Sequence, residues 1–213
     1  MTTGPLLVTE RLELWRPVAD DLPQLVAMVS HPQTARYLGG PQPMAEHFAR
    51  FARNAGSWQL YEYGSFMVRL RGGDGRIVGN CGVFHSWRGL GEDFDDRPEA
   101  GWILADGYAG QGLAQEALRA VLAWLDGRLD TEIVCMIEPA NAPSLRLAGK
   151  LGFRPTRDAA LPSGQPVRLF ARQADGSSAG IGAVGVRPEA SAPEVDRLEK
   201  IIRHRLTGGI VAR

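Results

Sequence analysis

The amino-acid sequence predicts an α+β fold in which helices flank a mixed, mostly antiparallel sheet. Two apolar runs, residues 66–70 and 77–84, are joined by the turn Gly72-Gly73-Asp74-Gly75, which predicts an antiparallel hairpin. Strand-like and helix-like runs then alternate from residue 99 to residue 153. This combination favours an α+β architecture over a doubly wound one. The 213 residues, 44% of them hydrophobic, are enough for a globular domain that buries a full core.

The N-terminal part of the chain is predicted to form one strand and two helices. Apolar and polar residues alternate over residues 11–16, which is typical of a half-buried strand. Cap candidates at residues 20–21, followed by Pro23, indicate the start of the first helix. The apolar stripes of the two helices consist of Leu22, Leu25, Val26 and Val29, and of Met44, Phe48, Phe51 and Ala52. We expect the second helix to end near Asn54 and Gly56.

The later part of the domain alternates strands and helices. Strands are expected over residues 99–104, 133–137 and 167–171. A glycine-rich segment, residues 107–112, follows the first of them and opens a helix whose stripe consists of Ala114, Ala117, Leu118, Val121, Leu122 and Leu125. The second helix begins near Pro143, with Asn141 as its N-cap, and ends at Gly152.

The composition of the chain changes sharply after residue 174. We therefore expect a globular domain over residues 1–174 and a flexible linker, rich in Gly, Ser, Ala and Pro, over residues 175–193. Residues 194–213 are expected to form an amphipathic helix and a tail, preceded by a capping-box pattern at Ser191 to Glu194. This helix either docks on its own domain or forms a subunit contact in a homodimer. Docking is favoured because an exposed apolar stripe is costly.

Charge, cysteine and histidine usage exclude several classes of function. Basic and acidic residues balance at 24 each, which gives no reason to expect nucleic acid or an anionic membrane as partner. Cys81 and Cys135 lie in apolar runs and are expected to be buried free thiols. The four histidines form no ligand-spaced cluster, so no metal site is expected. The N-terminal residues lack the apolar core of a secretory signal, and we expect a cytoplasmic protein.

The glycine-rich segment between a strand and a helix predicts an anion site, because the free amides and the dipole of the helix N-terminus attract negative charge. A P-loop is excluded, since residues 107–117 contain no lysine. A dinucleotide fingerprint fits better through Gly110 and Gly112, with Glu138 at the end of the next strand, but Gln115 occupies its third glycine position. The antiparallel hairpin upstream also argues against that fold.

Four sequence motifs in a fixed order resemble the GNAT superfamily of N-acetyltransferases. They are the strand of residues 99–104, the loop Ala109-Gly110-Gln111-Gly112-Leu113-Ala114, the segment Asn141-Ala142-Pro143-Ser144, and Lys150-Leu151-Gly152-Phe153. Together with the opening Val8-Thr9-Glu10-Arg11, they are similar to the RimJ/RimL-like branch, the ribosomal-protein-alanine acetyltransferases. The resemblance spans about residues 6–172.

This resemblance implies a sheet that splays open between two central parallel strands, with acetyl-coenzyme A as co-substrate in the gap. The backbone of Ile103 and Leu104 would meet the acetyl group and the pantothenic arm, which Asn141 would also contact. The loop amides, those of Ala109, Gly110, Gln111, Gly112, Leu113 and Ala114, would hold the pyrophosphate. The chain departs from the family at Ala109, where glutamine or arginine is usual. It also has Met136 and Ala148 where RimI-like relatives place a glutamate base and a tyrosine acid, which excludes that pair.

The predicted reaction is direct transfer of the acetyl group to a primary amine. Glu99 is the first candidate for the base, acting directly or through water, and His85 is the second. Ser144 is the candidate acid, because its resemblance to a serine of the RimL-like branch implies that it protonates the departing thiolate. The Leu104 amide would polarise the thioester carbonyl. At pH 7, about one α-amine molecule in ten is neutral, against about one lysine-like amine in 2,500. How much a base is needed therefore depends on the acceptor.

The acceptor and two rival functions stay open at the level of sequence. The acceptor is a protein N-terminus or a small-molecule amine, and the acidic residues of segment 91–99 would attract it as a cation. Trp87, Tyr61 and Tyr63 are candidates for the wall of the same cleft. The rival functions are a non-catalytic sensor or interaction module that binds acetyl-coenzyme A, and a dinucleotide-dependent oxidoreductase.

Overall fold

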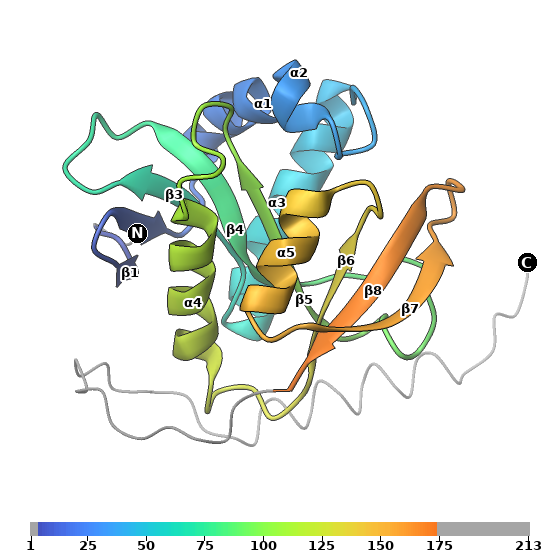
Figure 1. Cartoon of the computed structure of the whole chain (residues 1–213). Coiled ribbons are helices and arrows are strands. Elements are labelled where there is room, and N and C mark those ends of the chain that lie inside the picture. The colour runs from blue at the N-terminus through green and yellow to red at the C-terminus, as the bar shows by residue number, and fades with distance from the viewer. Residues whose placement is uncertain (1–3, 174–213) are drawn as a thin grey trace, which may run out of the picture. The chain divides into compact units, whose positions relative to one another are not determined.

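The computed structural model describes residues 4–173, which form one mixed sheet with helices on both faces (Figure 1). The strands are β1 (Leu7–Val8), β2 (Leu12–Trp15), β3 (Ser65–Leu70), β4 (Ile77–His85), β5 (Pro98–Leu104), β6 (Ile133–Ile137), β7 (Arg154–Ala160) and β8 (Pro166–Arg172). The helices are α1 (Leu22–Ser30), α2 (Pro32–Ala35), α3 (Met44–Tyr61), α4 (Leu113–Leu125) and α5 (Ala142–Lys150). A short 3-10 turn, Ala19–Asp21, precedes α1.

The strand order is β1-β2-β3-β4-β5-β6-β8-β7. Within residues 4–173, six of the strand pairings are antiparallel and one, between β5 and β6, is parallel. The predicted α+β class and the β3–β4 hairpin are therefore confirmed. A doubly wound dinucleotide fold is wrong for this part of the chain, because such a fold needs a mostly parallel sheet.

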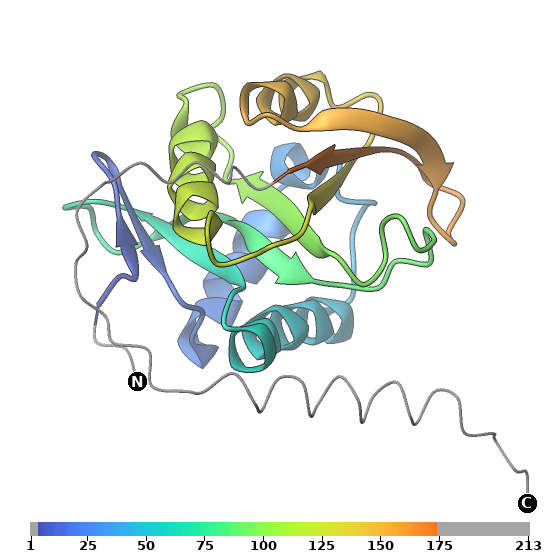
Figure 2. The same cartoon turned by 90° about the horizontal axis from the view of Figure 1, so that it is seen from below.

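Helices α4 and α5 cover one face of the sheet, and α1 and α3 cover the other (Figure 2). The amphipathic pattern of α4 explains its position, since its predicted stripe is almost wholly buried against strand residues such as Leu14 and Phe66. On the opposite face, Met28 of α1 and Phe51 of α3 pack with Met67 of β3. The sheet thus has two apolar faces, each closed by a pair of helices.

The parallel strands β5 and β6 pair at a single position, Glu99 opposite Val134. Beyond it the two strands diverge toward their C-terminal ends, as Figure 1 shows. On its other edge, β5 pairs with β4 along its whole length, from Pro98 to Leu104. The splayed pair of parallel strands that the family resemblance implied is therefore present.

The second helix differs from its predicted end, because α3 continues to Tyr61 instead of stopping near Asn54 and Gly56. A glycine inside a helix costs only about 1 kcal/mol relative to alanine. The last turns of α3 are anchored by two side chains: Ser57 Oγ donates to Tyr63 O at 2.8 Å, and the buried Trp58 donates through Nε1 to Ser65 O at 2.9 Å. These contacts outweigh the preference of Gly56 for a helix end.

Two short elements, β1 and α2, and the longer strand β7 were not predicted. Six of the seven residues of β7 are exposed, so the strand shows no alternation of apolar and polar residues. It forms because its backbone pairs with β8 at the edge of the sheet. An edge strand of this kind is defined by its partner strand, which local sequence does not reveal.

Cys81 and Cys135 are free and buried, as predicted. In the part of the chain that the structure describes, no group of three potential metal ligands comes together, and no helix is long and apolar enough to cross a membrane. The predicted linker, the C-terminal amphipathic helix and its homodimer contact fall in residues 175–213, outside the described residues.

Candidate active site

The splay between β5 and β6 opens into a cleft with a volume of about 390 Å³. Helix α3 with the segment before it, strands β4, β5 and β6, the start of α5 and the β7–β8 hairpin all contribute side chains. The cleft brings together four residues that the sequence singled out, which are Glu99, Ile103, Asn141 and Ser144. The loop of residues 109–114 does not line this cavity; it follows the C-terminal end of β5, where the splayed strands are farthest apart.

The glycine loop has the conformation of an anion cradle. Gly110 and Gly112 both have φ of 78°, in the left-handed region that favours glycine. Gly112 is the N-cap of α4, so the amides of Leu113 and Ala114 have no acceptor within the helix. A Cβ atom at Gly110 would meet no other atom within 4 Å, so the space beside this amide is open. The loop is therefore shaped to receive a group against its backbone.

Arg11 and Glu116 hold the loop against the N-terminal hairpin. Glu116 accepts hydrogen bonds from Thr9 Oγ1 at 2.6 Å, from the Arg11 amide at 2.9 Å and from Arg11 Nε at 2.7 Å. Arg11 Nη1 also donates to Gln111 O at 3.0 Å. Burial raises the pKa of Glu116, but these hydrogen bonds together outweigh it and hold the pKa below its usual value. Arg11 thus places a guanidinium group beside the loop, in which Ala109 supplies no charge.

Ile103 and Leu104, which were predicted to meet the acetyl group, direct their backbone amides to opposite sides of β5. The Ala105 amide donates to Val78 O of β4, and backbone groups alternate in direction along an antiparallel strand. The amides of Trp102 and Leu104 therefore point toward the splay, whereas the Ile103 amide points toward β4. Ile103 lines the cleft and also packs against the hydrophobic cluster between the sheet, α1 and α3, whereas Leu104 packs into the core beside α4. Leu104 would contribute a backbone amide only.

The start of α5 presents a hydroxyl to the cleft. Asn141 caps this helix as predicted, since its side chain accepts a hydrogen bond from the Ser144 amide at 3.2 Å. Trp102 Nε1 donates to Ser144 Oγ at 3.1 Å. An indole N–H can only donate, so it occupies a lone pair of the hydroxyl and leaves the hydroxyl proton for another acceptor. This geometry makes Ser144 a hydrogen-bond donor toward the cleft.

Glu99 is buried and tied to two side chains. Arg88 binds it in bidentate geometry, with Nε to Oε2 and Nη2 to Oε1 both at 2.8 Å, and Ser86 Oγ donates to Oε2 as well. These contacts fix the position of the carboxylate and occupy both of its oxygens. Glu99 lies at the position where β5 and β6 pair, at the closed end of the splay.

His85 and the three aromatic candidates lie outside the residues that line the cleft. His85 stacks on Tyr61 at 4.2 Å between ring centroids, and its Nε2 lies 2.9 Å from Asp96 Oδ1. Burial raises the pKa of the neighbouring Tyr63 beyond its ordinary value, so its hydroxyl stays neutral. Trp87 is largely exposed. The expectation that these aromatic side chains wall the cleft is wrong.

The acidic loop before β5 is engaged in local contacts. Arg157 binds Asp93 through two nitrogens, both at 2.7 Å. Asp95 accepts hydrogen bonds from the amides of Arg88, Leu90 and Gly91. Apart from Glu99, no carboxylate of this loop lines the cleft. The expectation that the loop attracts a cationic acceptor therefore lacks support, since these carboxylates fix the loop itself.

Sequence reasoning missed the arginine residues of the cleft. Arg50 and Arg53 of α3 line it on the side opposite α5, and Arg88 follows the end of β4. From the sequence alone, Arg50 and Arg53 are expected on a solvent-exposed face of the helix. Neighbouring residues in the sequence do not show which face of α3 lies toward the cleft. The three-residue spacing of Arg50 and Arg53 was the one available signal that they act together.

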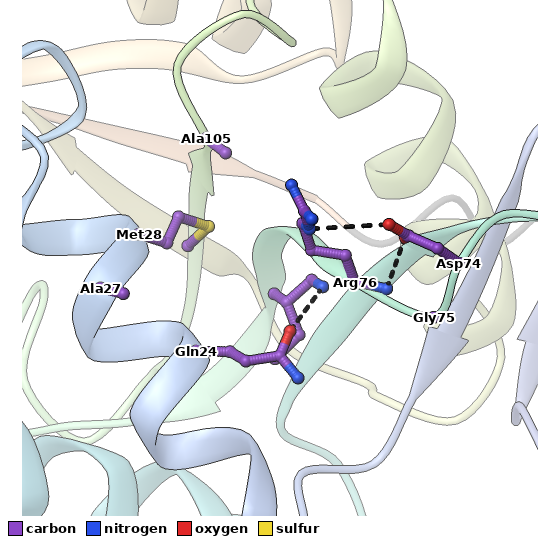
Figure 3. A pocket seen from close by; sticks show the side chains of 8 residues that line it. Gln24, Ala27, Met28, Asp74, Gly75, Arg76 and Ala105 are labelled. Atoms are coloured by element: carbon purple, nitrogen blue, oxygen red, sulfur yellow. Dashed lines mark hydrogen bonds and ion pairs between the residues drawn. The ribbon is translucent and has the colours of Figure 1, made fainter.

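A second, larger hollow of about 540 Å³ lies between α1 and the β3–β4 turn (Figure 3). Several of its polar groups are paired with one another or with the backbone. Asp74 contacts the exposed Arg76 at 3.7 Å, and Gln24 Oε1 accepts a hydrogen bond from the Ile77 amide at 3.2 Å. The hollow shares no lining residue with the cleft. Among the described residues, the only charged side chains that line it are those of Asp74 and Arg76, an exposed pair.

The chain matches the family model described as the acetyltransferase (GNAT) domain over residues 11–154. A solved structure from Bordetella pertussis, assigned to the GnaT acetyltransferase family, is 33% identical in sequence. The match covers 78% of this chain and 98% of that chain, with a TM-score of 0.70. These two findings concern the same segment that carries the glycine loop and the splayed strands.

Two more distant structures share the fold. Aminoglycoside acetyltransferase AAC(6')-Ib, solved in complex with coenzyme A, is 19% identical, with 76% of this chain and 94% of that chain covered and a TM-score of 0.62. Ribosomal-protein-S5-alanine acetyltransferase from Vibrio fischeri is 14% identical, with 79% and 96% covered and a TM-score of 0.62. At these identities the likeness concerns the fold alone.

Proposed function

Because the chain belongs to the GNAT acetyltransferase family, it is an enzyme that uses acetyl-coenzyme A as co-substrate, and we propose that it acetylates a primary amine bound in the cleft between β5 and β6. The observation that carries this proposal is the splay itself. After one paired position the two strands part, and the backbone amides of Trp102 and Leu104 face the opening. Such amides can hold an extended acyl-carrying arm as a neighbouring strand would.

The open glycine loop supports a place for the pyrophosphate of acetyl-coenzyme A. The amides of residues 110–114 would bind it, and hydrogen bonds to a charged group are worth about 1.5–3 kcal/mol each. Ala109 contributes its backbone only. Asn141 would contact the arm of the co-substrate while it caps α5. Ile103, which lines the cleft, would contact the acetyl end.

The reaction forms one bond and breaks one. The nitrogen lone pair of the acceptor forms a C–N bond with the acetyl carbonyl carbon, the C–S bond breaks, the amine loses a proton and the thiolate gains one. We assign Ser144 as the acid, because Trp102 leaves its hydroxyl proton free to donate. The Leu104 amide would stabilise the negative charge on the carbonyl oxygen.

Glu99 remains our candidate base, acting through water. Arg88 and Ser86 hold its carboxylate in place within the cleft. The demand on this base depends on the acceptor, because about one α-amine in ten is already neutral at pH 7, against about one lysine-like amine in 2,500.

The RimJ/RimL-like branch is proposed on the sequence motifs alone. The Vibrio fischeri enzyme acts on a ribosomal protein, as its name states, and the AAC(6')-Ib enzyme on aminoglycosides. Both are less than 25% identical to this chain, so neither identifies its acceptor. A protein N-terminus and a small-molecule amine both satisfy the proposed reaction.

Thermal unfolding with acetyl-coenzyme A, followed by thiol release with a panel of peptides and small amines, tests the proposed function. Saturating acetyl-coenzyme A should raise Tm, because it binds the folded state only; a ligand at 100 times its Kd adds about 2.7 kcal/mol of stability. Thiol release that depends on one class of amine would support the transfer. An unchanged Tm would refute the assigned site, and a raised Tm without turnover on any amine would favour a sensor.

A further inference from the structure

Helix α3 turns two arginine side chains into the cleft. Arg50 and Arg53 are three residues apart and so lie on one face of the helix, and both line the cavity together with Asn54. The rotation of α3 is fixed by its buried residues Phe51 and Trp58. In Figure 2, α3 lies on the face of the sheet opposite α4 and α5. The two arginine residues therefore reach the cleft from the face of the sheet opposite α4.

The cleft concentrates positive charge on this side. Burial lowers the pKa of Arg50 and of Arg53, and repulsion by Arg88 lowers both further, while Glu46 and Glu99 act in the opposite direction. Guanidinium groups stay protonated at neutral pH. Arg50, Arg53 and Arg88 thus raise one another's electrostatic energy as long as no anion lies between them.

Glu46 and Glu99 attract these two arginine residues without forming an ion pair with them among the described residues. Within residues 4–173, the side chains of Arg50 and Arg53 form no ion pair or hydrogen bond, whereas the Arg88 side chain is bound to Glu99. The other carboxylate of the cleft, Glu138, accepts a hydrogen bond from Gln165 Nε2 at 3.3 Å. Two guanidinium groups are therefore available to a ligand in the same cavity as Ser144.

We propose that the acceptor is a small amine that carries an anionic group, a carboxylate or a phosphate, and that Arg50 and Arg53 bind this group. The inference rests on the proposed function and names the acceptor class for the same reaction. Guanidinium groups match both anions in bidentate geometry. A volume of about 390 Å³ suits a small molecule. Polycationic amines would meet like charge and are disfavoured.

A matched three-carbon series tests the proposal: 3-aminopropyl phosphate, β-alanine, 3-aminopropanol and 1,3-diaminopropane. Thiol release should have a higher kcat/KM with the two anionic amines than with the alcohol or the diamine. Comparing the phosphate with the carboxylate then shows which anion the site prefers. In the double variant R50Q/R53Q, kcat/KM for the preferred anionic amine should fall about tenfold or more, since each lost charged hydrogen bond is worth at least 1.4 kcal/mol.

The control is Arg76→Gln, which removes an exposed arginine that lines the other hollow. It should leave every kcat/KM unchanged. For R50Q/R53Q, KM for acetyl-coenzyme A should also stay unchanged, because the glycine loop lies elsewhere. A rise in that KM with no effect on the amine would overturn the proposal and assign the arginines to the co-substrate.

A binding measurement separates failure of this inference from failure of the proposed function. With coenzyme A at saturation, 3-aminopropyl phosphate or β-alanine should raise Tm further in the wild-type protein but not in R50Q/R53Q. If coenzyme A raises Tm and neither anionic amine adds to it, the anionic acceptor is refuted while the acetyl-transfer site stands. If coenzyme A itself has no effect on Tm, the proposed function fails first.

Discussion

The Ser144 hydroxyl can donate its proton because of its two neighbours. Asn141 bonds to the Ser144 backbone rather than to its side chain, so the hydroxyl is not needed for the helix cap. Trp102 donates to the oxygen and fixes its position. The cap is thus made by Asn141, and proton donation by Ser144 is our proposal.

Ser144→Ala should lower kcat about 100-fold or more, because a general acid typically contributes about 10²–10⁴-fold. KM for acetyl-coenzyme A should change little, and so should Tm, because the Asn141 cap stays intact. Steady-state kinetics and thermal unfolding of the purified variant measure both. Asn141→Ala is the matched control, since it should cost about 1 kcal/mol of stability through the lost cap. Full activity of the Ser144 variant would remove the serine from the chemistry.

Glu99→Gln should reduce stability as well as activity. The change leaves the guanidinium of Arg88 without its charged partner, and breaking one side of a buried ion pair costs about 3–5 kcal/mol. If Glu99 is also the base, the acidic limb of the kcat profile against pH should disappear. A purely structural role would lower Tm but leave the shape of that profile unchanged. Ser86→Ala, which keeps the ion pair, should retain the profile and most of the stability.

Among the elements, the glycine loop and the start of α4 act as one unit. Glu116, in the first turn of α4, reaches back to Thr9 and Arg11, and Arg11 in turn holds the loop at Gln111. The loop is therefore fixed before any ligand binds. A preorganised loop loses less conformational entropy on binding than one that must be ordered.

Gly110→Ala should weaken the affinity for acetyl-coenzyme A about tenfold or more, because a methyl group would occupy the open space beside the amides. The variant should also lose about 1 kcal/mol of stability through its positive φ. Gly127→Ala is the matched control: its φ is 80° and its Cβ also meets nothing within 4 Å. It should lose similar stability with unchanged affinity. Equal affinity in both variants, measured by calorimetry, would contradict the role of the loop.

At the level of the whole molecule, ionised carboxylates tie distant segments together. Hydrogen bonds hold the pKa of Glu116 below its usual 4.5, and the Arg157 side chain lowers the pKa of Asp93. A carboxyl whose folded pKa lies below its unfolded value stabilises the fold above the unfolded pKa and loses this contribution as the pH falls through the folded pKa. Both groups therefore predict acid destabilisation.

The free energy of unfolding should be flat near neutral pH and fall below about pH 4.5. Glu116→Gln should lower it at neutral pH and make its decline in acid less steep, since one titrating group with a depressed pKa is gone. Urea unfolding at several pH values measures both effects. An unchanged slope would mean that the Thr9 and Arg11 contacts do not persist in solution.

Local patterns were sufficient to predict much of this fold and part of the site. The β3–β4 hairpin, the stripe of α4 and the Asn141 cap are each encoded within a few residues. The end of α3 and the strand β7 depend on tertiary partners, Ser65 and β8. The cleft also depends on tertiary contacts. Glu99 pairs with Arg88 across 11 residues and a loop. Arg50 lines the cleft only because of the way α3 packs on the sheet.

The single paired position between β5 and β6 is also a seam that divides the backbone ladder of the sheet into two parts. Strands β1 to β5 form one hydrogen-bonded block, and β6, β8 and β7 form the other, with the Glu99–Val134 pair as their only backbone ladder contact in the described sheet. Amide hydrogen exchange should therefore resolve two blocks with different opening free energies. Acetyl-coenzyme A would contact both sides of the seam, so its binding should bring their protection factors together.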